Sequence, residues 1–118
     1  MKAKDMRNTG IKEIPIINNE YKVIVVFGDA LEVGKCLKKY GYKGVDADFG
    51  DDRGYTYYDR DCHPVIALPY KPKNAEDMGV LAHEAVHAVK YVFDFIGEES
   101  IDEAFAHSVG AVVREALS

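Results

Sequence analysis

The residues best suited to chemistry are two histidines and a glutamate in the pattern His83-Glu84-x-x-His87. On a helix, His83 and His87 lie about 40° apart around the axis, so both imidazoles project from one face and can bind one Zn²⁺. Glu84 lies about 100° round from His83, beside the metal rather than on it. Zinc lowers the pKa of a coordinated water toward ~7, and a neighbouring carboxylate can then accept its proton. The motif therefore predicts a hydrolytic zinc site with Glu84 as general base.

The surroundings of the motif strengthen this interpretation. Short patterns of this kind also arise by chance, and an exposed helix can carry two histidines and a glutamate without any function. Here the motif lies in the middle of a helix expected over residues 75–95, which is apolar nearly all round and so is expected to pack on more than one side. Buried polar groups are costly unless they are paired or bound to a metal.

A catalytic zinc site needs a third protein ligand and one open position. Glu103 is the favoured candidate, because Gly97 is expected to end the first helix and the chain then returns as a second helix through about Leu117. Ser100 and Glu103 also form a capping-box pattern, so Glu103 has a purely structural alternative. The other acidic candidates, and a weaker thiol candidate, are Asp94, Glu98, Glu99, Asp102 and Cys62.

The motif followed by Asp102-Glu103-Ala104-Phe105-Ala106 resembles the gluzincin zinc metallopeptidases, above all the very short, single-domain members of that group. The resemblance covers about residues 64–117. It implies a zincin-like fold in which His83, His87 and Glu103 bind Zn²⁺ and Glu84 is the general base. It also implies that the strand before the motif helix, here about 64–70, is the edge strand that binds an extended peptide substrate.

Three further residues have open roles at such a site. Larger gluzincins carry an aspartate four residues after the ligand glutamate, where this chain has His107. His107 is interpreted as a hydrogen-bond partner of an imidazole, an oxyanion-stabilising group, an alternative ligand, or simply a half-buried histidine. Asp102 is a candidate support for the ligands. Tyr91 is expected on the metal face and could polarise a carbonyl, although a packed aromatic is the commoner role.

The elements that must position these groups follow from local patterns. The β-branched run 21–27 predicts a strand, and Asp29 predicts the N-cap of a helix through about Tyr40. Two strands are expected over 54–58 and 64–70, joined by a hairpin, and prolines near both ends of the second favour an edge strand. Residues 1–20 are expected to be an irregular or loosely paired arm, with Asn18-Asn19 as a turn. The predicted fold is therefore α+β, with a small, mostly antiparallel sheet packed on the motif helix.

Composition limits what else the chain can be. It has 118 residues, a net charge of −5 and 47% hydrophobic residues, which predicts a single domain over 1–118 with a small core. The acidic balance disfavours nucleic acid as a partner. No signal-peptide pattern and no membrane-spanning run is recognised, so we expect a cytoplasmic protein that does not bind membranes and whose two cysteines are thiols.

These observations predict a minimal zinc metallopeptidase acting on a peptide or protein substrate. Two alternatives stay open. One is a zinc-stabilised interaction module without turnover, in which the metal completes a small core. The other is a latent peptidase whose own chain, most simply residues 1–20, fills the cleft.

Overall fold

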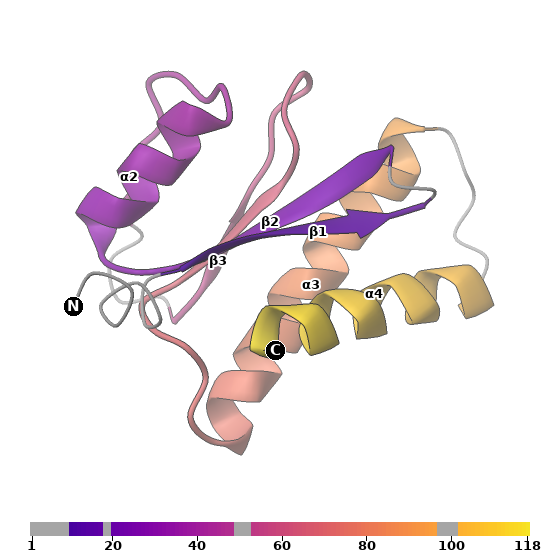
Figure 1. Ribbon diagram of the computed structural model, residues 1–118. Coiled ribbons are helices and arrows are strands. Elements are labelled where there is room, and N and C mark those ends of the chain that lie inside the picture. Colours follow the sequence, from indigo (N-terminus) through magenta and orange to yellow (C-terminus); the bar gives the residue numbers. More distant parts are fainter. Residues whose placement is uncertain (1–9, 18–19, 49–52, 97–101) are drawn as a thin grey trace.

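The computed structural model describes residues 10–17, 20–48, 53–96 and 102–118 (Figure 1). Within these residues it contains a four-stranded mixed sheet and three helices. In chain order the elements are β1 (Ile11–Ile16), β2 (Tyr21–Phe27), α2 (Ala30–Lys39), β3 (Tyr55–Tyr57), β4 (Val65–Leu68), α3 (Ala75–Phe95) and α4 (Asp102–Leu117). The α+β prediction is confirmed.

Helix α2 begins and ends where its sequence signals indicate. The Asp29 side chain accepts a hydrogen bond from the Glu32 backbone N–H at 3.0 Å, and the Glu32 carboxylate accepts one from the Asp29 N–H at 3.1 Å. This reciprocal capping box satisfies two of the free N–H groups at the helix start. Gly41 follows the helix with a φ of +92°, a left-handed conformation that glycine adopts without strain.

Helix α3 occupies the predicted range and is capped as predicted. The Asn74 side chain accepts a hydrogen bond from the Asp77 N–H at 2.8 Å. Helix α4 begins at Asp102 and ends at Leu117, close to the predicted bounds. The expected stop at Gly97 and the capping residue Ser100 lie outside the described residues.

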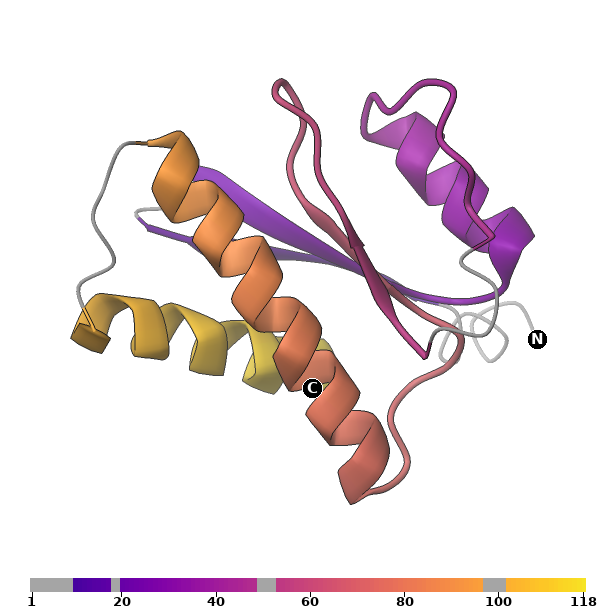
Figure 2. The same ribbon diagram turned by 180° about the vertical axis from the view of Figure 1, so that it is seen from behind.

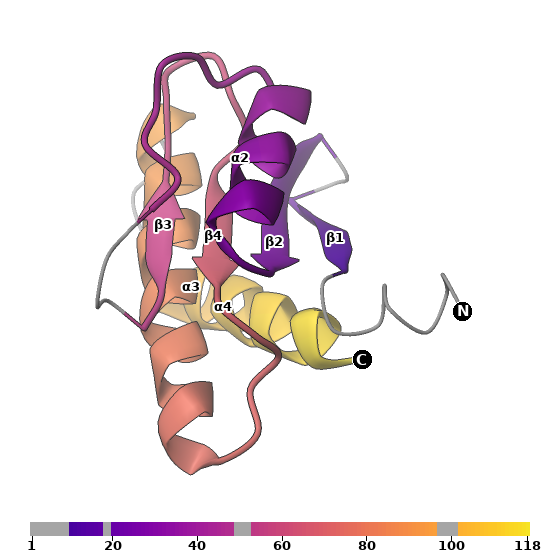
Figure 3. The same ribbon diagram turned by 90° about the vertical axis from the view of Figure 1, so that its left-hand side faces the viewer.

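The strands are arranged in the order β1-β2-β4-β3. β2 pairs with β1 antiparallel and with β4 parallel, and β3 pairs with β4 antiparallel. Helix α2 covers one face of this sheet, while α3 and α4 cross each other on the opposite face (Figures 2 and 3). The molecule therefore has three layers, with the motif helix α3 against one face of the sheet.

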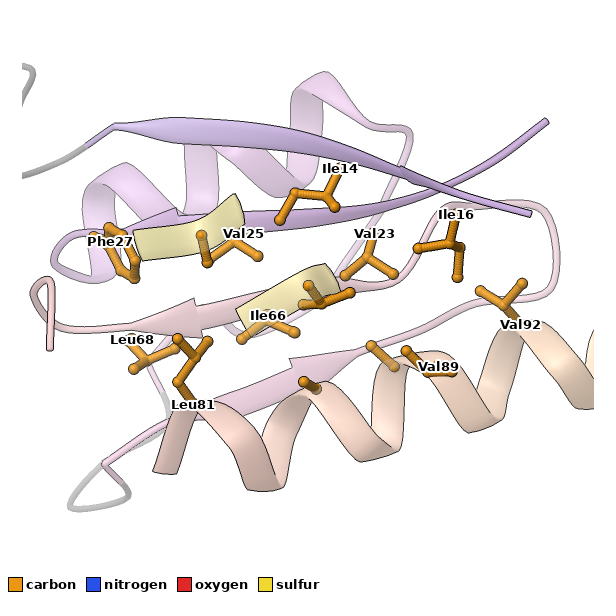
Figure 4. Packing of buried hydrophobic residues seen from close by; sticks show 14 of the residues in the cluster. Ile14, Ile16, Val23, Val25, Phe27, Ile66, Leu68, Leu81, Val89 and Val92 are labelled. Atoms are coloured by element: carbon orange, nitrogen blue, oxygen red, sulfur yellow. The ribbon is translucent and has the colours of Figure 1, made fainter. Parts of the chain in front are cut away.

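The core consists of two clusters, one on each face of the sheet. Alternate residues of a strand point to opposite faces, so Val23, Val25 and Phe27 of β2 face α3 and α4, whereas Ile24 and Val26 face α2. Figure 4 shows the first cluster, in which Ile66 of β4 packs between the sheet and α3. Because both faces of β2 and β4 are covered, each reads as a continuous apolar run.

Two expectations about the strands are wrong. The strand within 64–70 is not an edge strand, because β4 lies between β2 and β3. Its prolines do not interrupt the pairing, since Pro64 and Pro69 flank the four paired residues and the Pro64 carbonyl accepts a hydrogen bond from the Ile24 N–H at 2.9 Å. Residues 11–16, expected in an irregular or loosely paired arm, form the regular strand β1, which pairs with β2 along its whole length. Pro15 fits there because β1 is an outermost strand. The turn expected at Asn18-Asn19 lies outside the described residues.

No helix in the described part of the chain is long and apolar enough to cross a membrane.

Candidate active site

His83 and His87 lie side by side on α3, as their spacing predicts. Their Nε2 atoms are 3.2 Å apart, and the ring planes are inclined at 77°. Both side chains are exposed to solvent. The two imidazoles thus present a pair of nitrogen atoms at one point on the outer side of the helix.

This separation fits a shared zinc ion. With Zn–N bonds of about 2.0–2.1 Å and a tetrahedral angle, two ligand nitrogens lie about 3.3 Å apart. The observed 3.2 Å needs almost no adjustment to meet that requirement. The same distance also suits one imidazole N–H donating to the other nitrogen, so only metal binding itself separates the two explanations.

The expectation that α3 packs on more than one side is confirmed, since α3 contacts both the sheet and α4, but the two motif histidines are not buried. The buried residues of α3 face the sheet and α4, but Met78 and Val86 are 44% and 40% exposed on the remaining side. His83 and His87 belong to that open side. These exposed histidines therefore have no cost of burial that a metal would have to offset. The case for zinc depends on the geometry of the pair.

Glu84 is turned toward β3. One of its carboxylate oxygens, Oε1, accepts a hydrogen bond from the Thr56 hydroxyl at 2.6 Å, and the side chain is half-buried. Thr56 is the central residue of β3 and is itself buried. Glu84 is consequently held by the strand, next to the two histidines but not between them.

A hollow of about 610 Å³ brings these groups together between β3 and α3. It is lined by Arg53, Gly54, Tyr55, Thr56, Tyr58, Glu76, Gly79, Val80, His83, Glu84 and His87. Arg53 crosses from the strand side to the start of α3, where its guanidinium pairs with Glu76 at 3.1 Å and Asp77 at 2.7 Å. All three motif residues therefore line one hollow beside the outermost strand β3.

The structure does not bring Glu103 to the histidines. Helix α4 packs on α3 through Phe93 and Phe105, whose ring centroids are 5.6 Å apart, and its buried face includes Val112. Glu103 precedes Val112 by nine residues, which at about 100° per residue places it on the opposite, exposed side of α4. Among the described residues, no three His, Cys, Asp or Glu side chains form a group that could hold a metal ion.

The other candidates on α3 and α4 also lie apart from the hollow. His107 is exposed on α4 and does not line the hollow, and of Asp102 only its place at the helix start is described. Asp94 pairs with Lys90 at 3.4 Å. Tyr91 stacks on Tyr58, with ring centroids 4.9 Å apart, and its hydroxyl donates to the Asp59 carbonyl. Tyr91 thus ties the β3–β4 hairpin to α3 and is not positioned to polarise a carbonyl in the hollow.

The cysteines do not contribute to this site. Cys36 is buried on α2, on the far face of the sheet, and burial raises the pKa of its thiol to about 11. Burial, with Asp59 and Asp61 nearby, also raises the pKa of the Cys62 thiol. Cys62 and His63 line a separate hollow of about 300 Å³ rather than the one that contains the histidine pair.

The site residues that the sequence analysis missed lie in β3 or just before it. Arg53, Gly54 and Thr56 line the hollow, yet they belong to no motif. Alternation along 54–58 places Thr56 and Tyr58 on one side of the strand. It does not indicate which helix that side meets, because this depends on the order of strands in the sheet.

No family model, curated protein or solved structure matches this chain. A functional assignment therefore depends on the residues and geometry described above.

Proposed function

We propose that the protein is a zinc-dependent peptidase in which His83 and His87 hold the ion and Glu84 is the general base. One observation carries the proposal: two Nε2 atoms 3.2 Å apart, with a glutamate beside them, at the wall of a hollow. Two nitrogen ligands of one zinc ion lie about this far apart. The Glu84 carboxylate beside them is the kind of group that acts as a general base in hydrolysis.

Each residue has a defined task in the proposed reaction. Bound zinc would supply Lewis acidity toward the substrate carbonyl and would make water more acidic. Glu84 accepts a proton from the attacking water and returns it to the leaving amine. Its Oε1 is already held by Thr56, so Oε2 is the oxygen left to carry the proton.

The position of the hollow is suited to binding an extended peptide. The hollow has a volume of about 610 Å³ and runs beside β3, which has only β4 as a neighbouring strand among the described residues. Peptides commonly bind along the outermost strand of a sheet. We therefore propose that substrate lies along β3 (Tyr55–Tyr57) rather than along residues 64–70, which belong to an inner strand.

The proposed ligand set contains two residues of this chain. We leave Glu103 out of it, because its side chain lies on the exposed side of α4, away from α3. Glu98 and Glu99, which the sequence leaves open as alternatives, lie outside the described residues. Catalytic zinc sites usually have three protein ligands, so a two-histidine site is expected to bind zinc less tightly than such a site does.

Both alternatives to a working peptidase fit the structure less well. A metal that completes a small core is expected among buried ligands, whereas His83 and His87 are exposed at a hollow. A latent peptidase blocked by residues 1–20 is not supported by β1, because Ile11–Ile16 pairs at the edge of the sheet opposite to β3. Residues 1–9 lie outside the described part.

Metal analysis combined with a protease assay tests the proposal. The parent protein should bind close to one zinc per chain and hydrolyse fluorescein-labelled casein. His87→Ala should lose the zinc, while His107→Ala, which removes an exposed histidine outside the hollow, should keep it. Glu84→Gln should keep the zinc and lose about 10²–10⁴-fold in rate, the usual contribution of a general base.

Four results would refute the proposal: no zinc in the parent, no hydrolysis by the parent, equal zinc in the parent and His87→Ala, or undiminished hydrolysis by Glu84→Gln.

A further inference from the structure

Thr56 makes the closest polar contact to the proposed general base. Its hydroxyl lies 2.6 Å from Oε1 of Glu84 and 3.2 Å from the Glu84 backbone carbonyl oxygen. Thr56 is only 7% exposed, and Glu84 is half-buried. This contact joins the middle of β3 directly to the proposed catalytic residue on α3.

The single hydroxyl proton belongs to the carboxylate. A threonine hydroxyl donates one hydrogen bond, and both neighbouring atoms are acceptors. The carboxylate is charged and lies at the shorter distance, whereas a carbonyl within a helix already accepts a bond from the next turn. Oε1 is therefore fixed by Thr56, and Oε2 has no hydrogen-bond partner among the described residues.

The backbone around Thr56 is held close to α3. A Cβ added at Gly54 would lie 2.8 Å from Cγ1 of Val80 and 3.4 Å from Cγ of Glu84, so only glycine allows the start of β3 to come this near. The absence of a side chain at Gly54 therefore leaves room for the Glu84 side chain beside β3. The Thr56 bond then selects one orientation of its carboxylate.

We propose that Thr56 is the positioning residue of the site, which fixes one oxygen of Glu84 so that the other faces the reacting water. The inference depends on the proposed function and extends it to a residue outside the motif. It predicts a change in turnover without a change in metal or substrate binding. Misplacing a reacting group by about 1 Å can cost on the order of 100-fold in rate.

The kinetic test compares Thr56→Val, which removes the hydroxyl at nearly constant shape, with Thr56→Ser, which keeps it. A quenched fluorescent peptide selected by cleavage with the parent serves as substrate. Thr56→Val should lower kcat by about 10–100-fold and change KM by no more than about twofold, because only positioning is lost. Thr56→Ser should recover most of the lost kcat, and zinc content should be equal in all three proteins.

Tyr40→Phe is the matched control. It removes a hydroxyl that also donates to a carboxylate, that of Glu13, away from β3 and α3. It should leave kcat near the parent value. Equal losses in Tyr40→Phe and Thr56→Val would mean a general effect on the fold and would overturn the inference, as would parental kcat in Thr56→Val.

A stability measurement tests the contact without any assay of activity. Melting temperatures of Thr56→Val, Glu84→Ala and the double variant should be non-additive, because the two side chains interact directly. Additive shifts would overturn the inference even if the peptidase is active. Non-additive shifts together with a parent that cleaves nothing would refute the proposed function, and the positioning role with it, while leaving the contact established.

Discussion

The two edges of the sheet are built in different ways. β1, at one edge, is six residues long, carries Lys12, Glu13 and Pro15, and contacts α4. β3, at the other edge, is three residues long and lies against α3 beside the hollow that contains the histidine pair. One edge is long and charged, and the other is short and next to a candidate site.

This difference explains where chemistry can occur. Charged side chains and proline on an outermost strand discourage pairing with other chains, and β1 carries both. Because α4 lies against β1, its outer face, including Glu103, is directed away from β3 and the histidines. Of the two edges, as far as the structure describes them, the β3 edge is the one beside the hollow lined by His83, Glu84 and His87.

The inner strands between the two edges should dominate stability. Ile66 of β4 is fully buried, and we expect Ile66→Ala to lower the free energy of unfolding by about 2–5 kcal/mol. Ile11→Ala, at an outermost position that is 40% exposed, should cost well under half as much. Urea denaturation measures both. Equal costs would contradict the assignment of β4 as an inner strand.

Gly54, next to β3, should be more sensitive to substitution than Gly110 of α4, the helix that contacts β1. Gly54→Ala places a methyl group 2.8 Å from Val80, and we expect it to destabilise the fold by about 1–3 kcal/mol. Gly110→Ala in α4 meets nothing within 4 Å and should stabilise the helix by up to about 1 kcal/mol. Thermal unfolding of the two variants should shift in opposite directions. A stabilising Gly54→Ala would show that β3 does not approach α3 so closely.

Glu103 allows a sharper comparison between the exposed side of α4 and the histidine pair on α3. Its side chain is exposed on α4, so Glu103→Ala should leave zinc content unchanged and alter stability by no more than about 0.5 kcal/mol. Zinc analysis beside His87→Ala measures the first effect. Loss of zinc in Glu103→Ala would instead place this residue among the ligands, as the gluzincin resemblance implies.

The smallest effect is expected from the charged edge itself. Hydrogen bonds from the Tyr40 hydroxyl and from Lys22 hold the pKa of the exposed Glu13 carboxyl below its usual range. A carboxyl with a lowered pKa in the folded state stabilises the protein above its unfolded-state pKa, and this contribution is lost as the pH falls. Melting temperatures of Glu13→Gln should therefore fall slightly less steeply than those of the parent between about pH 6 and pH 3. Parallel curves would show that the interaction contributes nothing.

Local signals in the sequence were sufficient for most elements. Capping side chains at Asp29 and Asn74 marked two helix starts, and the apolar run 21–27 marked a strand buried on both faces. The four-residue spacing of His83 and His87 predicted their proximity, since helical geometry alone determines it. These features depend on residues that are close in the chain.

Long-range arrangement was not predictable in the same way. Strand order decides that β4 is inner and β3 outermost, and nothing in residues 64–70 records which strands lie on either side. The position of Glu103 depends on which face of α4 packs against α3, and the Ser100-x-x-Glu103 pattern was compatible with several arrangements. Thr56 was missed for the same reason, because its partner Glu84 is 28 residues away.

The parallel pairing of β2 with β4 has a kinetic consequence. Ile24 pairs with Val65, so the intervening chain, including α2 and β3, must form a closed loop before these strands can join. Non-local contacts of this kind slow folding relative to local helical ones. We therefore expect the chain to refold more slowly than an all-helical chain of the same length, which stopped-flow circular dichroism can measure.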